Sequence, residues 1–458
     1  MSLRLLAIGC LLSAVTVVPA ADPAVVTVDT KRKTTDKAWT PRETRSIAAV
    51  EGWESMRAPP LNRYGGRTDR KLAEPGFFRV LKGSRGWTMA DPDGCAWYSV
   101  GVCSVSPNKT ARGREALRST FGDEDGWARA TLELLRTNGF NTAACWSDWA
   151  TLRRATNALP YTTQLNLMSR YGSRYRGAWQ VSGHLAFSNN CIHVFDPAFE
   201  VHARTNAAAA LAEVRDDPLC VGHFSDNELP FPADALDRFL ALPEGDPGRA
   251  AAEAWVREHG TRKGPKGWGD ADRTAFLAVV ADRYYGICAA AIRAADPNHL
   301  YLGSRLHGSD HRKPELYRAC GRHADVVSMN YYSAWAPDAA LLEQLSVAAG
   351  RPLMVTEWYA KGMDSGMENI SGAGWTVKTQ RDRGLFYQNF TLGLLESPHC
   401  VGWHWFKYTD NDPTDTRADP SNRDSNKGIV DTTFKPYPDL LDRMRALNGR
   451  AWPVLDRR

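Results

Sequence analysis

Two glutamates that follow apolar runs are the residues of this chain best suited to carry chemistry. The run VGHFSDNELPF contains Asn227 and Glu228 directly after its apolar part, and PLMVTEWYAKG has the same shape and leads to Glu357. Cleavage of a glycosidic bond typically uses two carboxyl groups, one on each side of the scissile bond. The pair therefore predicts a glycosidase site, provided that the fold brings these two strand ends together.

The chemistry requires the two carboxyl groups to differ in protonation. One must be protonated to help the leaving oxygen depart, and the other must be ionised to attack the sugar or stabilise its cation. Their surroundings must therefore separate the two pKa values. Asn227 is suited to hydrogen-bond a sugar 2-hydroxyl, and Tyr331 or Tyr332 to hydrogen-bond Glu357 and keep it ionised. For each glutamate taken alone, the alternative is a surface ion pair at a strand end.

Eight short apolar runs separated by helix-like segments would position these residues. Alternation of this kind predicts parallel strands joined by helices, and eight units predict an α/β fold of the (β/α)8 TIM barrel type. In such a barrel the carboxyl ends of all strands surround one mouth. An open doubly wound sheet is the alternative, but it calls for a glycine-rich phosphate loop that we do not find. The runs are residues 97–105, 140–146, 159–165, 220–226, 300–306, 325–332, 352–358 and 400–406.

The chain divides into three parts. Residues 1–21 have Arg4, an apolar stretch and a small-residue cleavage site, so we expect a signal peptide and an exported protein, periplasmic or extracellular. Residues 22–96 read as a short N-terminal arm and a β-hairpin packed on the barrel. Residues 97–458 form the catalytic barrel with a C-terminal extension. Within it, residues 241–269 read as an insertion that either shapes a substrate groove or is a solvated excursion.

Composition narrows the classes of partner. The formal charge of +5 over 458 residues comes without a concentrated basic stripe, so we expect no nucleic-acid partner. After the predicted signal peptide, no apolar run is long enough to predict a membrane span. The sequence does not indicate the oligomeric state. The 16 tryptophans fit a polysaccharide or oligosaccharide partner, since flat aromatic faces stack on sugars, although most are expected in the core.

No metal site and no cofactor is expected. The sequence has no His-Glu-x-x-His motif, no phosphate-binding P-loop and no Gly-x-Ser-x-Gly elbow. Beyond Cys10, the cysteines are scattered and form no Cys-x-x-Cys pair. They are expected to be mostly buried thiols, with one or two disulfides as the alternative.

Other strand ends supply candidates for sugar binding. Because side chains alternate along a strand, His404 should face opposite to its two tryptophan neighbours, so not all three can face the mouth. For every candidate the alternative is a packing or loop role. Together with Asn227, the substrate-binding candidates are Asn141, Trp146, Arg305, His307, Tyr331, Trp358, Trp403 and Trp405.

The Asn-Glu pair on the fourth predicted strand and the glutamate on the seventh resemble the retaining clan A glycoside hydrolases. Within that clan, SDNELPF, TEWYAKG, SGAGWTVKTQRDRGLFYQNFTL and WHWFKYTDND are similar to the β-agarase family, glycoside hydrolase family 50. The similarity covers roughly residues 76–440. It implies a retaining double displacement on a β-linked galactose-containing glycan, with Glu228 as acid/base, Glu357 as nucleophile and aromatic residues of strand eight beneath the sugar.

The sequence departs from the family pattern in two ways, so substrates other than agarose stay open. Typical members carry a large N-terminal carbohydrate-binding β domain, whereas only a short arm is expected here. The strand-four motif also continues as Leu-Pro-Phe, where a polar or aromatic residue is usual. The alternatives are another β-glycan (β-glucan, β-galactan or β-mannan), a non-catalytic carbohydrate-binding barrel, or a different hydrolase or lyase on the same fold. Long mouth loops favour exo-action among the hydrolytic modes.

Overall fold

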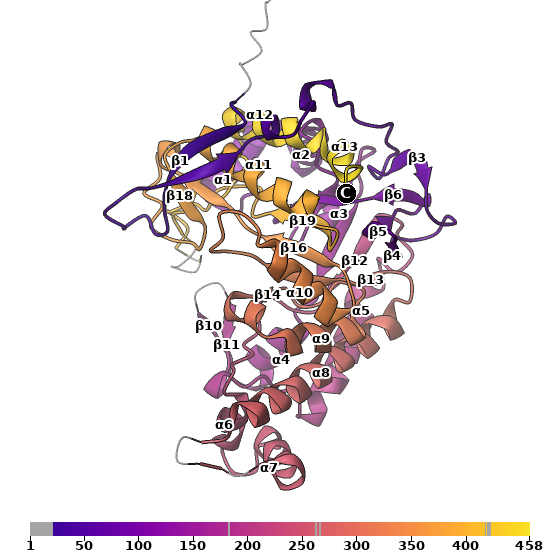
Figure 1. The fold of residues 1–458 in the computed structure, drawn as a ribbon, viewed down its shortest axis with the longest axis vertical. Coiled ribbons are helices and arrows are strands. Elements are labelled where there is room, and N and C mark those ends of the chain that lie inside the picture. Colours follow the sequence, from indigo (N-terminus) through magenta and orange to yellow (C-terminus); the bar gives the residue numbers. More distant parts are fainter. Residues whose placement is uncertain (1–21, 182–183, 262, 265–266, 417, 419–422) are drawn as a thin grey trace, which may run out of the picture.

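The computed structural model describes residues 22–458 except 182–183, 262, 265–266, 417 and 419–422. The predicted signal peptide, residues 1–21, lies outside the described residues. At the centre is a curved, all-parallel sheet in the order β13-β12-β9-β8-β7-β19-β16-β15-β14 (Figure 1). Its strands are β7 (Ser99–Val102), β8 (Thr142–Ala143), β9 (Tyr161–Gln164), β12 (Cys220–Phe224), β13 (Leu300–Tyr301), β14 (Leu306–His307), β15 (Val327–Asn330), β16 (Leu353–Glu357) and β19 (Cys400–Trp405).

Each apolar run predicted to form a strand supplies part of this sheet. The run at residues 300–306 supplies two short strands, β13 and β14, which stand at opposite ends of the strand order. The mixed α/β architecture with a curved parallel sheet is therefore confirmed. Closure of the sheet into a ring of eight units remains an interpretation.

Helices cover the outer face of the sheet, and the main apolar core lies between the two layers. Side-chain caps set several helix starts; α11, for example, begins at a capping box formed by Thr379 and Asp382. The helices are α1 (Ala111–Phe121), α2 (Glu124–Thr137), α3 (Trp149–Leu152), α4 (Leu167–Tyr175), α5 (Pro197–Leu211), α6 (Ala235–Leu240), α7 (Pro247–His259), α8 (Asp270–Ala295), α9 (Pro314–His323), α10 (Ala339–Ala349), α11 (Gln380–Glu396), α12 (Pro438–Asn448) and α13 (Ala451–Leu455). Short 3-10 helices are η1 (Ile47–Ala49), η2 (Trp53–Ser55), η3 (Ser188–Asn190), η4 (Gly308–Arg312) and η5 (Met363–Ser365).

A small antiparallel sheet fills the amino-terminal end of the barrel-like sheet. It has the order β3-β6-β5-β4, built from β3 (Arg67–Lys71), β4 (Arg79–Gly83), β5 (Gly86–Ala90) and β6 (Cys95–Trp97). Trp97 is fully buried, and its indole nitrogen donates to the Tyr64 carbonyl at 2.8 Å. It packs with Phe78 and Met89 in a second apolar cluster that also contains Met354 of β16. These side chains form a floor beneath the sheet.

The N-terminal arm is more ordered than the extended arm or loop expected from its polar sequence. Its strands β1 (Val25–Lys31) and β2 (Thr40–Arg45) form a hairpin, and β1 pairs with β18 (Trp375–Val377), which pairs with β17 (Ala360–Gly362). The Arg42 guanidinium lies 4.5 Å from the Trp375 ring centroid. The arm therefore braces the segment that follows the seventh predicted strand. The division of the chain into arm and barrel remains a prediction.

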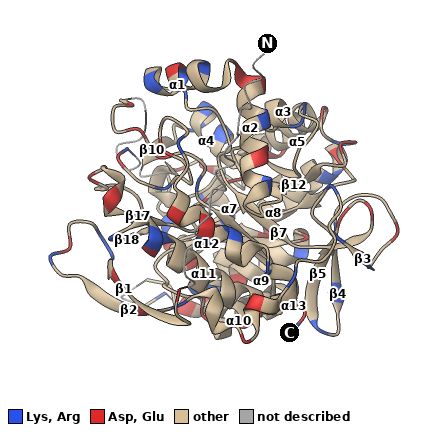
Figure 2. Ribbon diagram, turned by 90° about the horizontal axis from the view of Figure 1, so that it is seen from above, with Lys and Arg blue, Asp and Glu red and all other residues tan. Residues whose placement is uncertain are grey.

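Charge is spread over the surface, and the cysteines are buried. Basic and acidic segments are interspersed over the face seen in Figure 2, without a single-signed stripe. Cys95, Cys103, Cys145, Cys191, Cys220, Cys288, Cys320 and Cys400 are all buried free thiols. Among the described residues, α8 is long and apolar enough to cross a membrane by length and composition, but 61% of its most apolar window is buried in the fold. A core helix gives the same pattern.

Replacing Trp97 with alanine tests the floor. Because the side chain is fully buried, its removal should cost about 3–5 kcal/mol of unfolding free energy, from lost transfer energy and the cavity left behind. Trp179→Ala is the matched control, since that side chain is 52% exposed and its removal should change stability by about 0.5 kcal/mol or less. Urea unfolding followed by circular dichroism measures both variants. Equal stability losses would show that Trp97 does not anchor a packed floor.

Candidate active site

The two glutamates predicted from sequence lie at the same end of the sheet, joined by one asparagine. Glu228 follows β12 and Glu357 ends β16. Asn330, the last residue of β15, is in register with Glu357, and its amide nitrogen donates to Glu228 Oε1 at 2.8 Å. Thr356 donates to the Asn330 amide oxygen at 2.9 Å, which fixes the orientation of the amide. The carboxyl ends of β12, β15 and β16 therefore converge on one site.

Glu357 is held by two donors. The Arg305 guanidinium donates to Glu357 Oε1 at 2.7 Å, and the Tyr332 hydroxyl donates to Oε2 at 2.6 Å. Arg305 is fully buried, and its guanidinium lies 4.2 Å from the Trp146 ring centroid. Both donors favour the ionised carboxylate over the neutral acid.

Glu228 faces two imidazoles instead of a permanent cation. Its Oε2 lies 3.7 Å from Nδ1 of His184 and 3.9 Å from Nδ1 of His307, and these contacts become ion pairs only when the imidazoles are protonated. His184 comes from a hairpin of β10 (Trp179–Val181) and β11 (His184–Ala186). We did not predict His184, because the hairpin is short, polar and outside the strand pattern.

Several residues of this site adopt a backbone conformation that L-amino acids rarely take. Trp146, Glu228 and Arg305 have φ angles of 63°, 51° and 56°. Non-glycine residues in the left-handed region cost free energy and persist where surrounding structure holds them, often at functional sites. Three such residues at one mouth support the interpretation that this mouth carries the function.

The two carboxyl groups have displaced pKa values. Burial raises the pKa of Glu357 to about 7, although Arg305 acts against the shift. Burial also acts to raise the pKa of Glu228, but His184 and His307 bring it below its ordinary value. These directions place the higher pKa on Glu357 in the free protein. Protonated imidazoles would add to the lowering at Glu228, whereas Arg305 is charged at every accessible pH.

The structure brings four of the predicted binding residues to this mouth. Asn227 accepts a hydrogen bond from Asn330 at 3.1 Å, and Trp146 covers Arg305. His307 lies beside Glu228, as described above. These residues lie around the carboxyl pair, and their roles in binding remain predictions.

The structure contradicts the predicted position of Asn141. We predicted that it closes the second strand at the mouth, but it precedes β8 and lies at the opposite end of the sheet. Its amide oxygen accepts from the Val100 nitrogen at 2.8 Å, and its amide nitrogen donates to the Tyr98 carbonyl at 2.9 Å. The strand is short and begins after Asn141, so this side chain closes backbone hydrogen bonds at the start of β7.

The structure also contradicts the prediction that three tryptophans line the mouth. Trp358, Trp403 and Trp405 are at most 1% exposed and pack in the core between the sheet and α11. Trp358 stacks on Phe390 of α11 at 4.4 Å between ring centroids. His404, with the opposite facing, donates to or accepts from Ser99 at 2.9 Å. His404 does face opposite to Trp403 and Trp405, as predicted, but the two tryptophans point outward from the sheet towards the helices.

Tyr331 does not contact Glu357. Its hydroxyl accepts a hydrogen bond from the Asp338 backbone nitrogen at 3.1 Å, and its ring packs on His311 and Phe390. Of the two tyrosines considered from sequence, Tyr332 is the one that reaches the carboxylate. The chain turns after Asn330, so neighbouring tyrosines leave the strand in different directions.

One buried cluster has the donor types of a metal site. Ligand atoms of Cys220, His223 and His299 lie within 4.8 Å of one another. Asp296 Oδ2 lies 2.9 Å from His223 Nε2 and 2.7 Å from His299 Nδ1, so these imidazole nitrogens already have a carboxylate partner. A metal ion would have to replace these hydrogen bonds, and the cluster is apart from the carboxyl pair.

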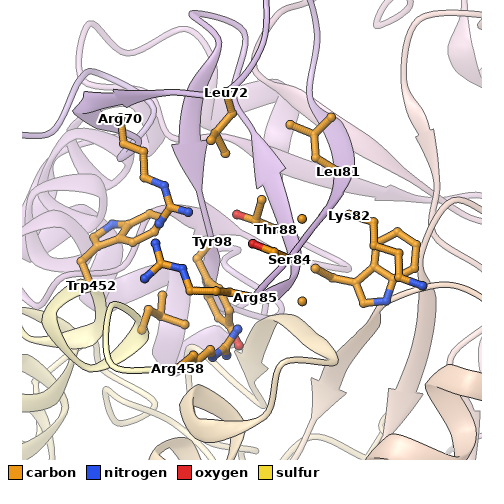
Figure 3. A pocket seen from close by; sticks show the side chains of 14 residues that line it. Arg70, Leu72, Leu81, Lys82, Ser84, Arg85, Thr88, Tyr98, Trp452 and Arg458 are labelled. Atoms are coloured by element: carbon orange, nitrogen blue, oxygen red, sulfur yellow. The ribbon is translucent and has the colours of Figure 1, made fainter.

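A separate hollow of about 410 Å³ lies between the floor sheet and the C-terminal helix α13 (Figure 3). Arg70, Arg85 and Arg458 project into it beside Trp452. Its lining residues include no aspartate or glutamate. It therefore has no pair of acids with which to break a glycosidic bond, and the candidate active site is the mouth that carries Glu228 and Glu357.

Comparisons with known proteins show which proteins the chain resembles. No family model matches the chain. It is 26% identical to β-agarase A of Vibrio sp. (strain JT0107), and the alignment covers 84% of this chain and 47% of that protein. It thus spans about half the length of the curated relatives that it matches. The chain is therefore similar in sequence to β-agarases, and this similarity supports the relationship predicted from its motifs.

Solved structures give the same relationship. The crystal structure of BpGH50 is 28% identical, with a TM-score of 0.82 and coverage of 94% of this chain and 96% of that one. A structure described as an exo-β-agarase is 22% identical, with a TM-score of 0.73 and coverage of 89% and 69%. The second likeness bears on the fold alone.

Tyr332→Phe tests the arrangement around Glu357. Loss of a donor to the carboxylate should raise the pKa of Glu357 further above its value of about 7, because the ionised form loses stabilisation. Tyr331→Phe is the matched control, since that hydroxyl bonds to the Asp338 backbone. Carbon-13 NMR titration of the glutamate carboxyl groups measures both. An unchanged Glu357 titration in Tyr332→Phe would contradict the contact.

Proposed function

We propose that this chain is a retaining glycoside hydrolase that cleaves β-linked galactose-containing polysaccharides or oligosaccharides. The observation that carries the proposal is the pair of buried carboxyl groups linked through Asn330, with a permanent cation on Glu357 and titratable imidazoles on Glu228. The β-agarase relatives support the galactan substrate. The predicted export of the chain fits a substrate polymer found outside the cell.

The proposal includes a closed (β/α)8 barrel. Four residues separate β13 from β14, the two strands that end the sheet order. The chain at the end of β13 bonds in both directions: the Leu302 nitrogen donates to the His223 carbonyl at 2.9 Å, and the Asp325 nitrogen donates to the Tyr301 carbonyl at 2.9 Å. One bent fifth strand would therefore close the ring, with all strand ends at a common mouth.

In the first step, a carboxylate oxygen of Glu357 bonds to the anomeric carbon while the glycosidic bond breaks. The proton of Glu228 passes to the departing oxygen, so the leaving sugar is released as an alcohol. Arg305 and Tyr332 hold Glu357 ionised and aimed at the carbon. Asn227 is positioned for a hydrogen bond to the sugar 2-hydroxyl.

In the second step, Glu228 acts as a base. It takes a proton from a water molecule whose oxygen bonds to the anomeric carbon, and the bond to Glu357 breaks with its electron pair returning to the carboxylate. Two inversions give net retention. The pair ends in its starting state, with one proton on Glu228.

Substitution of each glutamate separates these roles. Glu357→Gln should abolish turnover of every glycoside, because no nucleophile remains. Glu228→Gln should lose about 10²–10⁴-fold on a natural sugar leaving group and much less in the first step on an activated aryl glycoside, which needs little protonation. Initial rates and burst amplitudes measure these differences. Glu115→Gln, on an exposed side chain, is the control.

Azide distinguishes the acid/base further. In Glu228→Ala, azide should attack the glycosyl-enzyme without needing a base and restore turnover, yielding a β-glycosyl azide. Proton NMR identifies the product and its anomeric configuration. Equal losses on both substrate types without azide rescue would remove Glu228 from the acid/base role.

We further propose exo-action, because one side of the mouth is walled by loops tied to each other. Asn369 accepts from the Asn426 backbone nitrogen at 2.7 Å, and Asn426 in turn accepts from the Gly362 nitrogen at 3.0 Å. The buried Lys361 ammonium donates to the carbonyls of Asn369 and Ser371 at 3.0 and 2.9 Å. A wall fixed in this way favours a cleft closed at one end.

Product size over time tests the mode of action. Exo-action should release a mono- or disaccharide steadily while the viscosity of a dissolved galactan stays nearly constant. Viscometry and chromatography of the same samples give both quantities. A rapid early fall in viscosity with mixed oligomers would instead mean an open groove and internal cleavage.

A further inference from the structure

A polar groove of about 690 Å³ opens beside the proposed acid/base. It runs between α4, α5 and the β10–β11 hairpin, and it includes Asn227 and His184, both neighbours of Glu228. Arg170 and Arg174 of α4 line it, and none of its lining residues is acidic. A substrate that reaches Glu228 from this side therefore meets basic and neutral side chains.

The two arginines have no ion-pair partner among the described residues, unlike others close to them. Arg176, two positions further on, pairs with Asp196 at 3.4 Å and Asp246 at 2.6 Å. Arg170 and Arg174 are exposed and four residues apart on one helix, a spacing at which like charges repel and destabilise the helix. The fold thus keeps two uncompensated positive charges on the wall of the groove.

The charge of the two arginines is felt at the neighbouring helix. His202 of α5 also lines the groove and packs on Tyr171 and Tyr175 of α4. Its pKa is lowered by burial and by the nearby charges of Arg174 and Arg170. A positive potential therefore extends between the two helices. An anion placed there would be stabilised by the same field.

The position of α4 is coupled to the catalytic loop. Asp226, two residues before Glu228, accepts hydrogen bonds from the backbone nitrogens of Met168 and Ser169 at 2.9 Å each. This buried carboxylate caps the first turn of α4, where Asn166 makes no side-chain cap of its own. Arg170, the next residue, and Arg174, about one turn further along α4, are therefore held at a set distance from the proposed acid/base.

We propose that this groove binds an anionic unit of the glycan, a sugar bearing a sulfate ester or a carboxylate, on the leaving-group side of the scissile bond. The inference rests on the proposed function and extends it to the substrate class. The leaving-group side follows because Glu228 protonates the departing oxygen. Guanidinium groups match the planar array of oxygens on both anions, and the exposed rings of Tyr175 and Trp179 lie at the ends of the elements that form the groove.

Matched oligosaccharides of one galactan backbone test the proposal: neutral, sulfated and carboxylated. The double variant Arg170→Gln/Arg174→Gln should raise the ratio of KM for the anionic to KM for the neutral substrate by about tenfold or more, since charge-assisted hydrogen bonds are lost. Added NaCl should raise the wild-type KM for the anionic substrate and have less effect on the variant. Arg318→Gln, an exposed arginine on α9, is the control.

Binding to the Glu357→Gln protein, measured by calorimetry, separates this inference from the proposed function. The proposal is supported if the sulfated or the carboxylated compound binds more tightly than the neutral one, and the compound that does so identifies the anion. This preference should disappear when Arg170→Gln and Arg174→Gln are added to the Glu357→Gln protein. The same affinity for all three compounds would overturn it, even if the wild type cleaves neutral galactan. Preference for an anion without turnover of any galactan by the wild type would instead overturn the proposed function alone.

Discussion

The buried contact between Arg305 and Glu357 is the constraint on which the mouth depends. A guanidinium removed from water must be paired, and here one nitrogen bonds to the carboxylate while the cation also lies over the Trp146 and Phe224 rings. The Arg305 backbone takes a positive φ between β13 and β14, and from there its side chain bonds to Glu357. The backbone conformation between these two strands is thus coupled to the orientation of the proposed nucleophile.

Sequence reasoning located the strands and both glutamates because apolar runs that end in polar groups are a strong local signal. The prediction that Trp403 and Trp405 line the mouth failed. Which of the two alternating sets of side chains faces inward depends on strand register, and the pairing of β16 with β19 contains a register shift. Sequence reasoning also missed His184, which reaches Glu228 from a hairpin that the chain places over the mouth through tertiary packing. Local patterns indicate where a strand ends, but not which distant loop covers that end.

The two halves of the site differ in how they depend on solvent pH. Glu357 bonds to Arg305, whose charge does not change, whereas Glu228 lies beside imidazoles whose charge does. Neutral imidazoles would stabilise ionised Glu228 less and so favour a proton on that residue, as its proposed acid role needs. When the imidazoles take up protons, the ionised form of Glu228 is stabilised, and the shared proton is displaced towards Glu357. Acidification would then weaken the proposed nucleophile, Glu357, and the proposed acid, Glu228, together.

The same reasoning connects the groove to the pair. An anionic sugar held by Arg170 and Arg174 brings negative charge to the side of the mouth where Glu228 lies. Negative charge nearby raises the pKa of a carboxyl group and so favours the protonated form. A bound anion would therefore oppose the effect of protonated imidazoles and keep the proton where the departing oxygen requires it. In this arrangement, the charge that selects the substrate also helps to set the protonation state of the acid.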